Sequence, residues 1–153
     1  MAVIGAGDAG PDLMRLAEEV GELVAGAGAV LVSGGLGGVM EASCRGAVTN
    51  GGLTVGFLPG LSRHEANPHV SIAFPTGMGE GRNHLVVRAS DGLIAVGGGF
   101  GTLSEIALSL KLGKPLVGLE TWRASIGDTD ADFPRAASAR EAVEILLQLL
   151  AIA

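Results

Sequence analysis

Cysteine, basic residues and long apolar runs are scarce in this sequence, and each shortage excludes a class of protein. A single thiol, Cys44, cannot form an intramolecular disulfide or supply a thiolate-rich metal site, and its apolar surroundings favour a buried structural thiol. The ten Lys and Arg residues are scattered and the net charge is −6, so we expect no nucleic-acid partner. No apolar run approaches the roughly 20 residues of a membrane-spanning helix, so we expect no membrane partner.

The amino terminus and the composition indicate a globular protein. The opening Met-Ala-Val-Ile-Gly lacks the basic segment of a signal peptide, so we expect none and a cytoplasmic location. Hydrophobic residues make up 48% of the chain, and the 26 glycines have no three-residue period, which excludes collagen. A length of 153 residues suits a single domain spanning residues 1–153.

Short apolar runs alternate with segments of helical periodicity along the chain. Strands are expected at residues 2–4, 29–32, 53–57, 70–74, 93–96 and 115–119. Helices are expected at residues 11–26, 39–48, 84–89 and 102–112. Ser138 and Glu141 have the spacing of a capping box, which predicts the start of a last helix near the carboxyl end of the sequence. This alternation predicts an α/β fold, a Rossmann-like, doubly wound parallel sheet in three layers with helices on both faces.

The most informative stretch runs from Leu93 to Glu105. A buried strand is followed by four glycines within five positions and then by a helix. Glycines allow positive φ angles and close approach of a ligand, and a helix N-terminus favours anions. The pattern therefore predicts a phosphate-binding loop made of Gly98, Gly99, Phe100, Gly101 and Thr102. The alternative is purely structural: Thr102 and Glu105 form a capping box, and the glycines only make a tight turn.

The same design occurs twice in the chain. A shift of 64 residues places Gly34, Gly35, Gly37 and Glu41 on Gly98, Gly99, Gly101 and Glu105. Two such loops at the same ends of parallel strands indicate a cleft with two anion-binding sides, which adds Gly34 and Gly35 to the predicted ligand site. For Glu41 the alternative is an acid that only complements the helix dipole.

A third glycine loop follows the first strand, where Gly5, Gly7 and Gly10 match the dinucleotide fingerprint G-x-G-x-x-G. That motif requires an acidic residue at the end of the next strand to bind the ribose hydroxyls. Here the next strand ends in Ser33 and two glycines, so an NAD-dependent oxidoreductase is disfavoured. Gly5 and Gly7 are still expected to line the ligand cleft.

Charged and metal-binding side chains are few near these loops. Arg82, at a glycine-flanked helix start, can clamp a phosphate; the alternative is an ordinary exposed charge. His64, Glu65 and His69 have no zinc-site spacing, and the aspartates at 128–132 lack the glycine and distal glutamate of a calcium loop. We therefore expect no metal site and no resident cofactor.

Three motifs together resemble the "Lonely Guy" (LOG) superfamily, formerly called lysine decarboxylase-like. They are Gly97-Gly-Gly-Phe-Gly-Thr-x-x-Glu105, Met78-x-x-x-Arg82-Asn83 and Ser33-Gly-Gly-x-Gly-Gly-x-Met40. The superfamily includes cytokinin riboside 5′-monophosphate phosphoribohydrolases and molybdenum cofactor carrier proteins. The resemblance extends from Val3 to Leu119, and it implies a homodimer or a larger homo-oligomer.

The resemblance also assigns roles to residues. In the hydrolases the glutamate and the arginine are the catalytic pair, which implies Glu105 and Arg82 here. Gly97 stands where the hydrolases have proline and Asn83 where they have lysine, and both departures are closer to the carrier-like branch. Asn83 joins the predicted ligand-binding residues.

Two functions for a phosphorylated small-molecule partner follow from this resemblance. The favoured one is hydrolysis of the N-glycosidic bond of a nucleoside 5′-monophosphate, which yields free base and ribose 5-phosphate. The alternative is a non-catalytic molybdopterin carrier or a nucleotide sensor. The sequence is compatible both with an enzyme, a nucleoside 5′-monophosphate phosphoribohydrolase, and with a non-catalytic binding protein.

Overall fold

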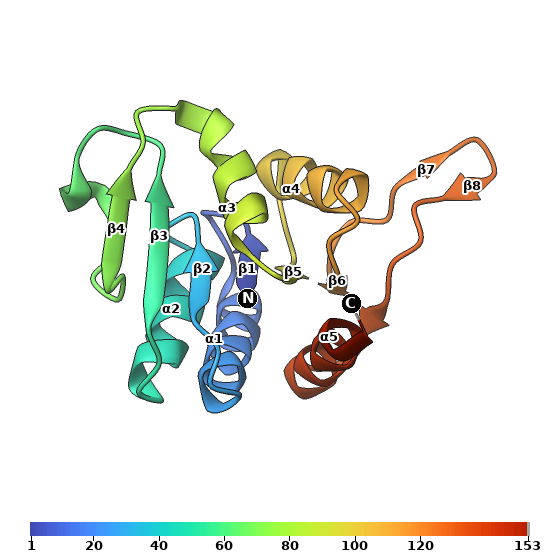
Figure 1. Cartoon of the computed structure of the whole chain (residues 1–153), viewed down its shortest axis with the longest axis horizontal. Coiled ribbons are helices and arrows are strands. Elements are labelled where there is room, and N and C mark those ends of the chain that lie inside the picture. Colours follow the sequence, from blue (N-terminus) through green and yellow to red (C-terminus); the bar gives the residue numbers. More distant parts are fainter. Residues whose placement is uncertain (153) are drawn as a thin grey trace.

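The computed structural model describes residues 1–152, and its centre is one parallel sheet of seven strands in the order β4-β3-β2-β1-β5-β6-β9 (Figure 1). The connections from β1 lead outward through β2 and β3 to β4, and the chain then returns to the other side of β1 for β5 and β6. The strands are β1 Ala2–Gly5, β2 Leu31–Ser33, β3 Thr54–Leu58, β4 Ile72–Pro75, β5 Leu93–Val96, β6 Leu116–Leu119 and β9 Arg135–Ala136.

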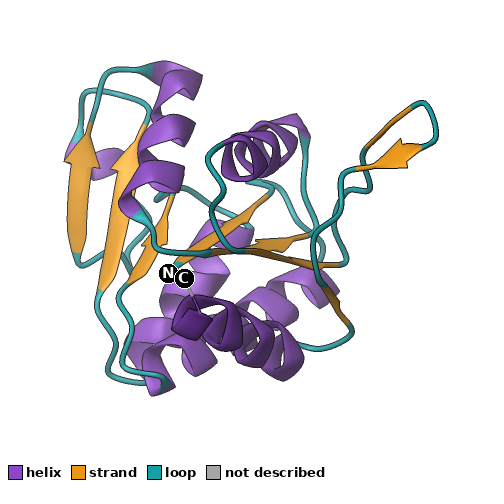
Figure 2. Cartoon of the chain, turned by 45° about the vertical axis from the view of Figure 1, so that its right-hand side comes forward, coloured by secondary structure: helices purple, strands orange, loops and turns teal. Residues whose placement is uncertain are grey.

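Helices cover both faces of this sheet and make the fold three-layered (Figure 1). One face carries α1 Pro11–Gly26, α2 Val39–Thr49 and α5 Ala139–Ile152, and the other carries α3 Asn83–Ala89 and α4 Phe100–Lys111. Two 3-10 turns, η1 Arg63–Glu65 and η2 Gly79–Arg82, lie in the loops. A two-stranded hairpin, β7 Ser125–Ile126 and β8 Thr129–Asp130, projects away from the sheet (Figure 2). The predicted Rossmann-like, doubly wound α/β fold is confirmed.

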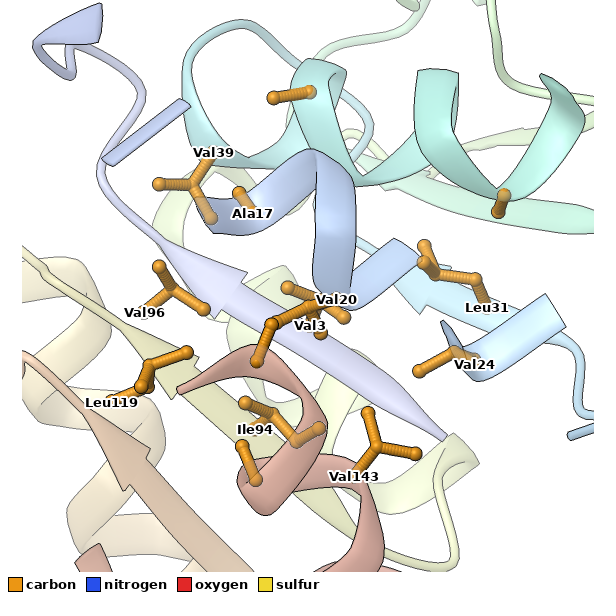
Figure 3. Packing of buried hydrophobic residues seen from close by; sticks show 14 of the residues in the cluster. Val3, Ala17, Val20, Val24, Leu31, Val39, Ile94, Val96, Leu119 and Val143 are labelled. Atoms are coloured by element: carbon orange, nitrogen blue, oxygen red, sulfur yellow. The ribbon is translucent and has the colours of Figure 1, made fainter. Parts of the chain in front are cut away.

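Burial on both faces explains why the strands are continuous apolar runs rather than alternating ones. Val3 and Ile94 face α1, α2 and α5, whereas Ile4 and Leu93 face α3 and α4. Figure 3 shows Val3 and Ile94 beneath Val20 of α1, in the larger of the two hydrophobic clusters. Cys44 is fully buried in this cluster, 3.4 Å from the Ser33 hydroxyl, as expected for a structural thiol.

The helices α1 and α2 approach each other closely through two glycines. A Cβ on Gly21 would clash with the carbonyl oxygen of Ser43, and one on Gly46 would clash with the carbonyl oxygen of Glu18. The pair is also joined by a bidentate ion pair, with both Arg45–Glu18 contacts at 2.8 Å. Backbone contact between α1 and α2 therefore depends on these small residues.

We predict that Gly46→Ala lowers the free energy of unfolding by about 2 kcal/mol, because the added methyl group forces the two backbones apart. Urea unfolding followed by circular dichroism measures this. Gly26→Ala is the matched control, since its Cβ would meet only the Asn50 side chain at 3.4 Å and alanine favours the helix. Equal stability of the two variants would contradict the prediction.

Two details of the expected secondary structure are wrong. The strand ending at Leu119 is not the last, because the short strand β9 pairs with it in parallel. The capping box of Thr102 and Glu105 is absent, because α4 begins at Phe100 with Gly99 as its N-cap, and no side chain caps it. By contrast, Ser138 does accept a hydrogen bond from the Glu141 amide at 3.2 Å, while the Glu141 carboxylate accepts one from the Ala137 amide at 2.7 Å.

Candidate ligand site

The strand order brings the three glycine loops together. β1 lies between β2 and β5, so the loops after these strands share the carboxyl edge of the sheet at its topological switch point, where ligands of such folds bind. They enclose a cavity of about 240 Å³. Its lining comprises Ile4, Gly5, Ala6, Gly7, Gly34, Leu36, Met40, Glu80, Arg82, Asn83, Gly99, Gly101, Thr102 and Glu105.

Most of the predicted site residues line this cavity, and three do not. Gly35 packs against Leu58, and Gly98 packs against Thr102, so both shape the loops from behind. The Phe100 side chain is 82% exposed, outside the cavity. Five lining residues are absent from the prediction: Ile4, Ala6, Leu36, Met40 and Glu80.

The glycine loop after β5 leads into the N-terminus of α4. The Leu103 amide donates to the Gly99 carbonyl at 3.0 Å, and the amides that precede it in the first turn have no acceptor within the helix. Gly97 and Gly98 have φ angles of 56° and 134°, a backbone that other residues rarely adopt. The unpaired amides and the helix dipole make this end of the cavity suitable for an anion.

The loop after β1 is held by α2. The Val39 amide donates to the Ala6 carbonyl at 3.0 Å, and Gly38, with φ of 62°, has no space for a Cβ beside Ala6 and Gly7. Gly10 has nothing within 4 Å of its Cβ position, so it does not provide the close helix–strand packing of a dinucleotide fingerprint. Both this open packing and the lack of an acidic residue at the end of β2 disfavour NAD binding.

Arg82 is the most unusual residue of the site. Its side chain is 7% exposed, and its Nε is buried without a hydrogen-bond partner in residues 1–152. Its Nη2 donates to the Met40 sulfur at 3.9 Å. Burial lowers the pKa of Arg82, although Glu105 and Glu80 act in the opposite direction. The interpretation as an ordinary exposed charge is wrong.

Gly34 makes room for this guanidinium. A Cβ at position 34 would lie 2.5 Å from Cζ of Arg82, so any larger residue would displace it. The ion pairs found in residues 1–152 are Arg15–Asp12 and Arg45–Glu18. Arg82 thus has no carboxylate in direct contact, and its charge is available to a ligand in the cavity.

Glu105 and Asn83 complete the polar side of the cavity. The Glu105 side chain is 5% exposed, and burial raises its pKa from 4.5 to about 7, against the opposing effect of Arg82 and with a further rise from Glu80. The folded protein therefore holds the proton of this carboxyl group more tightly than the unfolded chain does. Asn83 Nδ2 donates to the Ser104 hydroxyl at 3.2 Å, which connects the start of α3 to α4.

Residues 1–152 include no group of three or more His, Cys, Asp or Glu side chains placed to hold a metal ion. None of the helices in the described part of the chain combines the length and apolar character needed to cross a bilayer.

Residues 1–146 match the SLOG cluster4 family. The chain belongs to this family. The resemblance to the LOG superfamily is thereby confirmed, and the structural neighbours place this SLOG protein beside molybdenum cofactor carriers.

Three proteins that are similar to this chain are the following. An uncharacterised protein of Archaeoglobus fulgidus is 50% identical over 120 residues, which is 78% of this chain and 79% of the relative. The molybdenum cofactor binding protein of Rippkaea orientalis is 35% identical with a TM-score of 0.87, over 97% of this chain and 95% of that one. The molybdenum cofactor carrier protein of Chlamydomonas reinhardtii is 34% identical with a TM-score of 0.86, over 99% and 97%.

Proposed function

We propose that this SLOG protein binds a phosphorylated small molecule in the cavity at the carboxyl edge of its sheet. The observation that carries the proposal is the buried Nε of Arg82, which has no hydrogen-bond partner in residues 1–152. Burying a cation without hydrogen-bond partners destabilises the folded protein, and such a group is retained where an anionic ligand neutralises it and accepts its hydrogen bonds. The free amides at the start of α4 lie on the same cavity.

The phosphate position follows from these donors. Amides from Gly99 to Thr102 bind the phosphate at the helix N-terminus, the Thr102 hydroxyl adds a donor, and Arg82 neutralises the charge. No lysine lines the cavity, so Arg82 is its only basic side chain among the described residues. Recognition thus combines one cation with several backbone dipoles.

The carrier-like function is the better supported of the two. Two similar structures are of proteins named for binding or carrying the molybdenum cofactor. Gly97, with φ of 56°, cannot be replaced by the proline of the hydrolase motif, whose ring holds φ near −65°. The loop conformation here therefore differs from that of a proline loop, and we propose that the chain binds and carries a phosphorylated pterin- or nucleotide-like ligand.

Hydrolysis is the second candidate, and the position of Glu105 favours it. Cleaving an N-glycosidic bond builds positive charge on the ribose, which the ionised Glu105 can stabilise, and the same carboxylate can deprotonate a water molecule. Arg82 would stabilise charge on the phosphate or the departing base. Glu80, which also lines the cavity, is an additional acid for proton transfer.

Incubation with AMP and flavin mononucleotide (FMN) tests both candidates. We expect each ligand in hundredfold excess over its dissociation constant to stabilise the protein by about 3 kcal/mol, seen as a higher melting temperature. Only AMP has an N-glycosidic bond, so carriage predicts that AMP binds without releasing adenine, measured by chromatography. Base release that is lost in Glu105→Gln would establish the hydrolase instead. If neither ligand binds and no base appears, the proposed function is wrong.

A further inference from the structure

We propose that Phe100, supported by Trp122, forms a second subsite outside the cavity, which stacks on the planar ring of the ligand. The inference rests on the proposed function, because it assumes that the phosphate of this ligand lies in the cavity. Phe100 is the first residue of α4, and both of its sequence neighbours, Gly99 and Gly101, line the cavity. The backbone of Phe100 therefore lies at the rim of the cavity, and its exposed side chain starts from there.

The exposure of this ring requires an explanation. Aromatic residues make up only 3% of the chain, so few are available to fill the core. One of them, Phe100, is nevertheless 82% exposed. Its ring centroid lies 5.7 Å from that of Trp122, with the planes tilted by 32°. This is a normal aromatic pair, which leaves most of the Phe100 ring free for a further partner.

Trp122 is itself fixed to the glycine loop. Its indole N–H donates to the Gly99 carbonyl at 3.0 Å, and the adjacent Thr121 hydroxyl donates to the Gly97 carbonyl. Glu120, with φ of 51°, is the one non-glycine residue with a positive φ among residues 1–152. This turn directs Thr121 and Trp122 back onto the loop after β5. The aromatic platform, the pair Phe100 and Trp122, is therefore joined by hydrogen bonds to the loop whose amides are proposed to bind the phosphate.

The size of the cavity indicates what the platform binds. At about 240 Å³ the cavity is smaller than the roughly 300–1,000 Å³ that encloses a complete drug-sized ligand. A phosphate with its attached sugar or side chain fills it, so the ring of a nucleotide- or pterin-sized ligand extends past the rim. An exposed aromatic face at that point suits a planar heterocycle, which stacks without requiring a particular base.

Calorimetric titration of the full chain with AMP, FMN and ribose 5-phosphate tests the subsite. Ribose 5-phosphate carries the phosphate without a ring, so it should bind about tenfold more weakly than AMP or FMN. Phe100→Leu, which keeps the backbone amide of residue 100, should remove this difference, whereas Phe100→Tyr should keep it. Ile152→Ala, at a position 84% exposed on α5, is the control for losing an exposed apolar side chain.

Trp122 provides an independent readout, because it is the only tryptophan and the chain has no tyrosine. A stacked ring should quench its emission in the wild type and much less in Phe100→Leu, while ribose 5-phosphate should leave the emission unchanged. Equal affinity of the wild type for ribose 5-phosphate and both ring-bearing ligands would overturn the subsite alone. An equal loss of affinity for all three ligands in Phe100→Leu would also overturn the subsite alone. Failure of all three to bind the wild type would overturn the proposed function and this inference together.

Discussion

Arg82→Met is expected to stabilise the fold and, at the same time, to abolish tight binding of phosphorylated ligands. The guanidinium is 7% exposed with an unpartnered Nε, and it has no carboxylate in direct contact within residues 1–152. Replacing such a buried charge by an apolar side chain of similar length should raise the free energy of unfolding by about 1–4 kcal/mol. Loss of the one cationic side chain that residues 1–152 place in the cavity should weaken AMP binding by about 100-fold. Urea unfolding and calorimetry measure the two effects.

Arg88→Met is the matched control for this variant. Arg88 lies on the neighbouring helix α3, is exposed, and donates to His84 at 3.0 Å rather than to the cavity. It should change neither stability nor AMP affinity appreciably. A destabilised Arg82→Met would show that the arginine has a structural role. Unchanged AMP affinity would show that the phosphate binds elsewhere.

The stability of the wild type should fall as the pH rises from about 4.5 to above 7, relative to Glu105→Gln. Burial raises the pKa of Glu105 from 4.5 in the unfolded chain to about 7 in the folded protein. The folded state therefore binds more protons in this range, and the free energy of unfolding decreases with pH. A shift of this size corresponds to about 3 kcal/mol, fully present below pH 4.5 and lost once the pH passes about 7.

The test is a pair of unfolding curves at several pH values, one for each protein. Glutamine has nearly the shape of the protonated glutamate and no titration, so every other ionisable group contributes equally to both curves. The difference between the proteins should narrow towards acid and grow in favour of Glu105→Gln towards pH 8. If the difference in free energy of unfolding between the two proteins did not change with pH, Glu105 would have the same pKa in the folded and unfolded protein, and the prediction would be wrong.

The position of the site is predictable from the sequence because the relevant signals are local. A strand that runs directly into glycines and a helix places its loop at the carboxyl edge of the sheet, and the repetition of this pattern 64 residues apart identifies two neighbouring loops. The structure brings Gly34, Gly99 and Glu105 to one cavity for this reason. Their functional roles remain predictions.

The residues that sequence analysis misses are those whose position depends on distant contacts. Met40 closes the motif shared with the LOG superfamily, yet only the fold shows that its sulfur faces Arg82. Glu80 reaches the cavity through the 3-10 turn η2, which has no periodic signal. Glu105 cannot cap its own helix, because α4 begins at Phe100 and so places Glu105 in the second turn, where it lines the cavity. β9 has only two residues, too few for a recognisable alternation.

The fit between Gly34 and Arg82 restricts the order in which these positions can change. The guanidinium occupies the space that a Cβ at position 34 would need. Alanine at position 34 therefore expels the arginine from the site, whereas the same alanine is harmless once residue 82 is small. Both mutational routes to the double variant lose ligand binding at the first step, but only the route that begins at Gly34 passes through a protein with a displaced guanidinium. A copy of this protein released from the need to bind its ligand would thus lose the arginine first and the glycine second.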